Sequence, residues 1–259
     1  MAILNPSISG RPVASVSKRI DIDDVCRRVA KQSYALIDGP TVADLLTGFD
    51  SAALADWDAF ATSWDNMPRD GHMADGGTYR RRRHATLAAA ASSNTWFEKA
   101  HQPHYQGRDF NTLNGGIARH YQPIEASVLR GNTLASLVGL GCRVFGRMAP
   151  YYPWHIEVHQ FRIETEGDFV GKPTPEGIHR DGVNFVIMAM VQHRNMASGE
   201  STVYDLGKNP LRKFTLNKPL DLAIVNDEQV FHGVSPISAV DRRRPAVRDV
   251  LVVTFRKQF

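Results

Sequence analysis

The chain has 259 residues, of which 42% are hydrophobic and 22% are charged. This composition is typical of a folded globular protein and excludes a low-complexity chain. The formal net charge of +4 is too small an excess to predict nucleic-acid binding.

Membrane and disulfide signals are also missing from the sequence. The chain has no run of about 18 apolar residues, which would predict a membrane span, and residues 1–20 lack the apolar core of a signal peptide. Cys26 and Cys142 are the only cysteines, which favours two inert thiols in a reducing compartment. We therefore expect a cytoplasmic protein that binds neither nucleic acid nor a membrane. Its oligomeric state is left open.

The first part of the chain is expected to contain helices packed outside the rest of the fold. Residues 1–20 are rich in serine, proline and small side chains and predict a loose lead-in. Apolar residues recur at helical spacing over residues 21–30 and 41–60, with a short predicted strand over residues 34–37 between them. A further helix is expected over residues 124–138.

Four consecutive arginines, Arg80 to Arg83, lie in a predicted strand over residues 78–87. Alternate side chains of a strand point to opposite faces, so these arginines can face solvent or pair with carboxylates. Alternatively, one arginine on the inner face holds a substrate carboxylate by two parallel hydrogen bonds. The sequence leaves both interpretations open.

From residue 151 onward the chain consists of short segments rich in β-branched and aromatic residues, separated by Gly, Pro, Asn or Asp. Such segments predict strands. They cover residues 154–163, 185–192, 201–204, 213–216, 220–225, 229–232 and 248–255. Strands at this spacing indicate an antiparallel barrel or sandwich. We therefore predict a mainly β protein of one domain, residues 1–259, in which residues 21–150 form a helical and mixed front part and residues 151–259 form most of a β-barrel core.

A candidate metal site consists of His179-Arg180-Asp181, just before a predicted buried strand, and His232 further along the chain. Residues i and i+2 of an extended chain point to the same side, roughly 6–7 Å apart. The imidazole of His179 and the carboxylate of Asp181 can therefore bind one ion, and His232 completes the set from a neighbouring strand. Two histidines and one carboxylate that leave three positions open are typical of non-haem iron(II) oxygenases. We predict these three residues as metal ligands and as the catalytic centre.

Arg248 opens the last predicted strand, sixteen residues after His232. An arginine at this place can reach inward to a dicarboxylate at the metal, whereas a lone arginine before a strand is usually a solvated end-cap. Given the three metal ligands, we favour a role for Arg248 in cofactor binding. The rival arginines over residues 242–244 precede Pro245 and are expected in an exposed loop.

Two other interpretations of the histidines are rejected. His155, Glu157 and His159 alternate along one predicted strand, in which the two histidines would stand about 13 Å apart, too far to share one ion with bonds near 2.1 Å. The letters His-Arg-Asp also occur in protein kinases, but Asn184 lies at the wrong spacing and the glycine-rich phosphate loop is missing.

The sequence resembles the bacterial 2-oxoglutarate-dependent dioxygenases that include L-isoleucine 4-hydroxylase and the biofilm-stress-motility protein BsmA. The resemblance rests on VHQFRI (158–163), GIHRDG (177–182), GESTVYD (199–205), FHGVSPI (231–237) and RDVLVVTF (248–255). It implies a double-stranded β-helix fold, the jelly-roll of cupins, with iron(II) bound by His179, Asp181 and His232 and with O2 and 2-oxoglutarate as co-reactants. By the same resemblance Arg248 would bind the far carboxylate of 2-oxoglutarate. Gln160 and Thr202 are further candidates for the pocket, because they lie on strands within these motifs.

The resemblance further implies that a small molecule is hydroxylated while 2-oxoglutarate is decarboxylated to succinate, and a free aliphatic L-amino acid is the first choice. Another small molecule or an alkylated base is the alternative within enzymes, although a base would need aromatic stacking groups beside the iron. Two further alternatives are a non-enzymatic cupin-like barrel that binds a small molecule or a partner in stress, biofilm or motility responses, and a metal-dependent isomerase that does not use 2-oxoglutarate.

Overall fold

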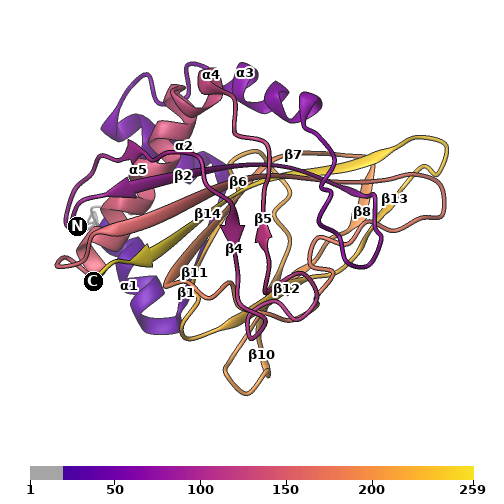
Figure 1. The fold of residues 1–259 in the computed structure, drawn as a ribbon. Helices are drawn as coiled ribbons and strands as arrows, with labels where there is room; N and C mark the ends of the chain where they lie inside the picture. The colour runs from indigo at the N-terminus through magenta and orange to yellow at the C-terminus, as the bar shows by residue number, and fades with distance from the viewer. Residues whose placement is uncertain (1–19) are drawn as a thin grey trace, which may run out of the picture.

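The computed structural model describes residues 20–259, so all but the last residue of the lead-in expected over residues 1–20 lies outside the described part. A seven-stranded antiparallel sheet with the order β1-β11-β7-β14-β6-β2-β3 forms the centre of the fold (Figure 1). Its strands are β1 (Tyr34–Ile37), β2 (Arg80–Ala89), β3 (Phe97–Glu98), β6 (Trp154–Thr165), β7 (Phe185–Arg194), β11 (Leu222–Asn226) and β14 (Ala246–Lys257).

Three smaller sheets complete the β structure. A three-stranded sheet contains β10 (Pro210–Phe214), β9 (Ser201–Tyr204) and β12 (Phe231–Val234), in that order. Two-stranded ribbons pair β13 (Ile237–Ala239) with β8 (Met196–Ser198), and β4 (His104–Tyr105) with β5 (Ala118–Arg119). Residues 104–119 are called the β4–β5 ribbon below.

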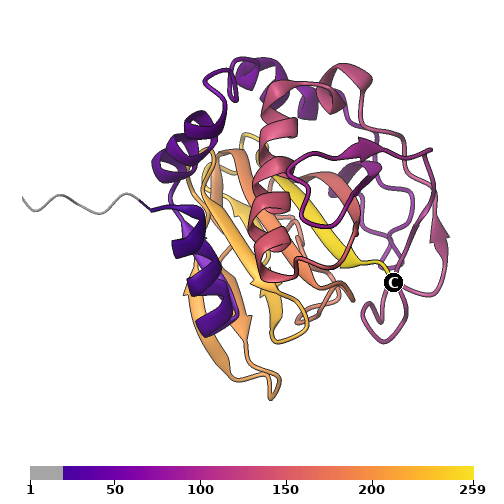
Figure 2. The same cartoon turned by 90° about the vertical axis from the view of Figure 1, so that its left-hand side faces the viewer.

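The helices lie together against one face of the large sheet (Figures 1 and 2). They are α1 (Ile22–Gln32), α2 (Gly39–Phe49), α3 (Trp57–Thr62), the 3-10 turn η1 (Ser63–Asn66), α4 (Ala126–Leu129) and α5 (Asn132–Met148). Helix α1 begins with a capping box, in which Asp21 and Asp24 each accept the other's backbone N–H. In α5, Phe145 stacks on Phe185 of the sheet with ring centroids 4.4 Å apart.

The two faces of the large sheet have different compositions because alternate side chains point to opposite sides. In β6, the even-numbered Ile156 and Val158 belong to the apolar core beneath the helices, together with Leu251 and Val253 of β14. The opposite face of these strands lines a cavity and carries polar side chains such as Glu157 among apolar ones such as Phe161. One face of the sheet therefore holds the fold together while the other builds a site.

The predicted fold class is confirmed: the protein is mainly β, with a jelly-roll core and helices packed outside. Each predicted strand lies within or overlaps an observed one. The expected helix over residues 41–60 is divided into α2 and α3, and the helix expected over residues 124–138 is observed as α4 and the longer α5. Gly141 explains part of this difference, since a Cβ atom there would lie 2.5 Å from the ring of Phe255. The helix thus continues through a glycine that close packing requires.

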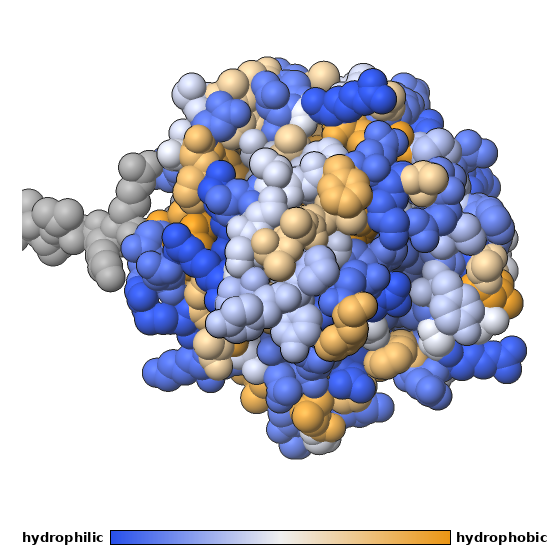
Figure 3. All heavy atoms as spheres, turned by 60° about the vertical axis from the view of Figure 1, so that its left-hand side comes forward, coloured by the Kyte–Doolittle hydropathy of each residue, from blue (hydrophilic) through white to orange (hydrophobic). Residues whose placement is uncertain are grey.

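No helix within residues 20–259 is long and apolar enough to span a membrane. On the face seen in Figure 3, apolar side chains occur singly or in small groups between hydrophilic ones. The thiols of Cys26 and Cys142 are both free.

Candidate active site

His179 and His232 lie opposite each other and are linked by two backbone hydrogen bonds. The amide of each donates to the carbonyl of the other, both at 2.9 Å, so the two imidazoles lie with ring centroids 4.5 Å apart. The carboxylate of Asp181 lies 3.7 Å from Nε2 of His179 and 3.5 Å from Nε2 of His232. The three predicted ligands therefore converge within a space that one metal ion can bridge.

Backbone geometry around the His-Arg-Asp segment fixes this arrangement. Gly177 and Gly182 flank the segment with φ of +81° and +78°, a conformation that residues with a Cβ rarely adopt. The carboxylate of Asp227 accepts the amides of Asp181, Gly182 and Val183 at 2.9, 2.8 and 3.1 Å. Asp227 thus positions the loop that carries the metal-binding carboxylate, and nothing in the sequence pattern indicates this role.

The surroundings of the two histidines suit a cation. Nδ1 of His179 donates to the carbonyl of Gly177 at 3.0 Å, which directs Nε2 at the shared space. Burial lowers the pKa of His179, but Asp181 and Glu176 outweigh burial and raise it to about 9; a metal ion would take the place of the Nε2 proton between these carboxylates. Burial and the neighbouring His179 lower the pKa of His232 to about 4. Two imidazole nitrogens and a carboxylate on one side of an open space fit iron(II).

Arg248 lies in the wall of the same cavity, which has a volume of about 370 Å³ and is also lined by His179, Asp181 and His232. Only 6% of the residue is exposed, and within residues 20–259 it has no carboxylate partner. Its buried Nε has no hydrogen-bond acceptor. Burial lowers the pKa of Arg248 to about 10, so the guanidinium is still charged at neutral pH. A buried and unpaired cation of this kind fits an anionic ligand.

The four arginines of the run point alternately to the two faces of β2, as the geometry of a strand requires. Arg81 pairs with Glu164, and Arg83 pairs with Glu125. On the other face, Arg80 and Arg82 line the cavity. Arg80 is neutralised by Asp70 at 2.7 Å.

Arg82 has no such carboxylate among the described residues. It is sandwiched between the rings of Tyr121 and Phe161, with its central carbon 4.1 and 4.5 Å from their centroids. Three arginines of the run therefore pair with carboxylates. Arg82 lines the cavity without an ion pair in the described part of the chain, and its guanidinium contacts the Tyr121 hydroxyl at 3.0 Å and Nδ1 of His159 at 2.9 Å. The alternative, that one arginine holds a substrate carboxylate, stays a prediction.

Gln160 and Thr202 do not line the cavity, and their expected place in the pocket is corrected. Gln160 is an even-numbered residue of β6, so its side chain lies on the helix side, where its amide nitrogen donates to Ser63 at 2.8 Å. Thr202 pairs with Gly233 in the small sheet, whereas the neighbouring Val203 pairs with His232. Thr202 therefore points away from the face that carries the histidine.

Two residues that no sequence motif indicated also contact the metal ligands. Glu176 lies 3.4 Å from Nε2 of His179, and its other oxygen is buried without a partner. The amide nitrogen of Gln106 donates to the backbone carbonyl of Asp181 at 3.2 Å, which links the β4–β5 ribbon to the site. The only feature of the sequence that could have indicated Glu176 is its position three residues before His179.

The model of the 2OG-Fe dioxygenase family matches residues 61–254, and the chain belongs to this family. Membership implies iron(II), 2-oxoglutarate and O2 as the co-reactants, in agreement with the geometry of His179, Asp181 and His232.

Two relatives carry named activities. A 3(1)-hydroxy-L-isoleucine 4-dioxygenase from Pantoea ananatis (strain AJ13355) is 25% identical over 159 residues, which are 60% of this chain and 64% of the relative. An L-isoleucine-4-hydroxylase from Bacillus thuringiensis is 24% identical over 156 residues, 59% of this chain and 64% of the relative. The matched region thus spans slightly less than two thirds of each relative.

Solved structures agree over a larger part of the chain. A bsmA homolog from Methylobium petroleophilum PM1 superposes with a TM-score of 0.78 at 30% identity, covering 93% of this chain and 94% of that one. The structure of IDO from Bacillus thuringiensis gives a TM-score of 0.76 at 16% identity, covering 92% of this chain and 100% of that one. At this lower identity the second likeness shows the fold alone.

Proposed function

We propose that the protein is an iron(II)- and 2-oxoglutarate-dependent dioxygenase that hydroxylates a free aliphatic L-amino acid. The observation that carries this proposal is that three metal-binding side chains and the unpaired Arg248 line one cavity. Bound iron(II) would supply O2 activation, coupled to decarboxylation of 2-oxoglutarate to succinate, and one oxygen atom would enter the substrate.

The residues of the chain would bind and orient the two organic reactants. His179, Asp181 and His232 would hold the iron and leave positions for 2-oxoglutarate and O2. Arg248 would bind the far carboxylate of 2-oxoglutarate by a charge-assisted fork, which fixes the direction of the cosubstrate in the cavity.

An amino-acid substrate needs a partner for each charged end. Arg82 is the member of the arginine run that lines the cavity and that forms no ion pair among residues 20–259, and we assign the substrate carboxylate to it. Glu176 also lines the cavity and has an unpartnered buried oxygen, so we assign the ammonium group to it. The names of the isoleucine-oxidising relatives support an aliphatic side chain for the substrate.

The test is an incubation of the iron-loaded protein with 2-oxoglutarate, O2 and a panel of free L-amino acids, with succinate and the product mass as readouts. We expect an aliphatic amino acid to stimulate succinate formation and to gain one oxygen atom, and His179→Ala to abolish both. If no member of the panel stimulates succinate formation, the substrate assignment is wrong. If iron and 2-oxoglutarate also give no visible charge-transfer band under anaerobic conditions, the enzyme class is wrong as well.

A further inference from the structure

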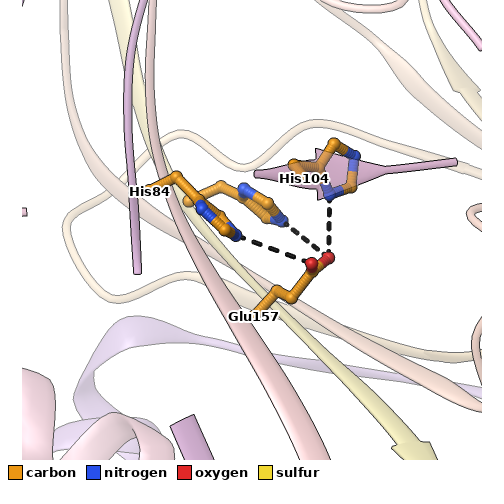
Figure 4. A group of neighbouring side chains, drawn as sticks. His84, His104 and Glu157 are labelled. Atoms are coloured by element: carbon orange, nitrogen blue, oxygen red, sulfur yellow. Dashed lines mark hydrogen bonds and ion pairs between the residues drawn. The ribbon is translucent and has the colours of Figure 1, made fainter. Parts of the chain in front are cut away.

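A second group of metal-binding side chains lies on the cavity side of the large sheet (Figure 4). His84 comes from β2, His104 from β4 and Glu157 from β6. Their side chains point toward one another, with Nδ1 of His104 2.8 Å and Nε2 of His84 3.6 Å from the carboxylate of Glu157. His159 is a fourth neighbour, 3.8 Å from the same carboxylate.

His84 is the feature that hydrogen bonding within the protein does not explain. Its ring is fully buried, and neither of its two nitrogens has a hydrogen-bond partner. Such a group is costly to bury. Its Nε2 is directed at Glu157 from beyond normal hydrogen-bond distance. A ligand between the two groups would satisfy both.

The spacing of His84 and Glu157 is that of two ligands around one ion. Two ligands that are each about 2.1 Å from a zinc ion, at a tetrahedral angle, lie roughly 3.4 Å apart. The separation of 3.6 Å between His84 and Glu157 is close to this value. It also matches the 3.5 and 3.7 Å that separate Asp181 from His232 and His179. The 2.8 Å between His104 and Glu157 is shorter because these two groups share a hydrogen bond, which a bound ion would replace.

The charges of the ligands also suit a cation. Burial lowers the pKa of His84, and burial lowers the pKa of His104 to about 4, so both imidazoles are neutral at pH 7. Nδ1 of His104 donates to Glu157 at 2.8 Å, and binding of an ion there would move this proton to Nε2 and free the Nδ1 lone pair. Burial alone would raise the pKa of Glu157, but the surrounding imidazoles outweigh it and hold the pKa well below its usual range. The set consists of two neutral nitrogens and one carboxylate.

His159 is left out of the ligand set because of Arg82, which lies 2.9 Å from its Nδ1. Since a guanidinium can only donate, Nδ1 of His159 accepts and the proton of the neutral ring lies on Nε2. This nitrogen cannot then bind a metal. The remaining His2Glu set, with a fourth position open, is one that zinc takes in proteins.

We propose that His84, His104 and Glu157 bind a zinc ion that fastens the β4–β5 ribbon to the large sheet. Strand β4 has only two residues and pairs only with β5, so few backbone hydrogen bonds hold it. The next residue, Gln106, donates to the carbonyl of Asp181. An ion at His104 would therefore hold the wall of the cavity that contacts the iron-binding loop.

A substrate ammonium group is the competing occupant of this place. It would enter from the cavity and meet Glu157, which lines it, but His84 does not line the cavity. A bound ammonium group would therefore leave the unpartnered imidazole of His84 unexplained. It also duplicates Glu176, which offers an unpartnered carboxylate oxygen to the same cavity.

The test is the number of zinc ions that the chelator-treated full chain retains after titration with zinc alone, measured by elemental analysis. We expect two per chain in the wild type, because zinc also fills the iron site, and one in His179→Ala. His104→Ala and Glu157→Gln should each retain one zinc ion. In the His179→Ala background, His104→Ala should weaken the affinity of the remaining site for zinc at least about 100-fold, because loss of a direct ligand costs more than loss of an outer partner. Two different variants are used, so that misfolding of one does not decide the result.

His155→Ala is the matched control. His155 is also a buried histidine beside Glu157, at 3.7 Å, but it lies outside the metal-binding group, so this variant should retain two ions. Retention of one zinc by the wild type, or of two by His104→Ala, would overturn the proposal. An equal loss in His155→Ala would overturn the assignment to these three residues. Unchanged zinc content in Glu157→Gln with a raised KM for an amino acid would show a substrate contact instead.

Discussion

Replacement of Arg248 by methionine removes the guanidinium that we assign to 2-oxoglutarate and keeps much of the apolar volume. Loss of one partner of a buried, hydrogen-bonded charge pair costs about 2–5 kcal/mol, and every 1.4 kcal/mol is about tenfold in affinity. Because Arg248 is 6% exposed and forms no ion pair within residues 20–259, we expect the full effect. The Kd for 2-oxoglutarate should rise roughly 30- to 4000-fold, with iron binding unchanged.

The assay is an anaerobic titration of the iron-loaded protein with 2-oxoglutarate, followed by its visible charge-transfer band. A parallel titration uses 2-oxopentanoate, which has a methyl group in place of the far carboxylate. The wild type should prefer 2-oxoglutarate strongly, and Arg248→Met should bind the two acids alike. The exposed Arg244, which pairs with Asp241, provides the control variant Arg244→Met, whose preference should be unchanged. Equal affinities for the two acids in the wild type, or an unchanged preference in Arg248→Met, would refute the assignment.

The sign of the stability change is a second readout of the same variant. In the absence of 2-oxoglutarate, Arg248 is a buried charge that forms no ion pair within the described residues, which is unfavourable. Arg248→Met should therefore leave the ligand-free protein at least as stable as the wild type in urea. It should lose the stabilisation that saturating 2-oxoglutarate gives the wild type. Strong destabilisation without ligand would indicate a structural role instead.

Three further predictions concern the support of the site. Asp227→Asn should weaken iron binding about 10–100-fold in a chelator competition, because the carboxylate that accepts three backbone amides positions the metal-binding loop; unchanged affinity would contradict this role. Burial alone would raise the pKa of Asp70, but Arg80 holds it below the ordinary 3.8. The pair therefore stabilises the fold above pH 3.8, and its contribution is lost as the pH falls through the folded-state pKa. Asp70→Asn should cost about 3–5 kcal/mol at pH 7 in urea unfolding, and the difference should shrink in acid; a pH-independent difference would argue against the ion pair. Gly182→Ala should destabilise more than Gly167→Ala in thermal melts, since both have positive φ but only at Gly182 would the new methyl lie 2.6 Å from a phenylalanine ring, and strain of this kind costs about 1–3 kcal/mol; equal losses would show that the ring yields.

The sequence predicted the fold well where local pattern and tertiary position agree. Each run of β-branched and aromatic residues after residue 151 corresponds to a strand, because these residues fit a sheet with one face in the core. The helix α5 was only partly predicted, since its glycines lower helix propensity. Its close packing on the sheet overrides that preference and could not be read locally.

The site was predictable to the extent that its residues are close in sequence or carry a motif. His179, Asp181 and His232 converge as expected, and Arg248 lines the same cavity. Gln160 was misplaced because membership of a motif does not give the face of a strand, although its neighbours Ile156 and Val158 point to the helix side. The pairing of His84 with His159 across β2 and β6 depends on strand order, which the sequence does not encode locally.

The alternation of core and cavity residues along β6, β7 and β14 bears on how such an enzyme can acquire a new substrate. Positions such as Met188 and Val252 line the cavity, whereas their neighbours Ile187 and Val253 pack beneath the helices. Alternate residues of the same strands therefore determine substrate selectivity and the stability of the fold. A mutant library confined to the cavity-lining residues would diversify the chemistry of the cavity while the residues beneath the helices keep the scaffold intact.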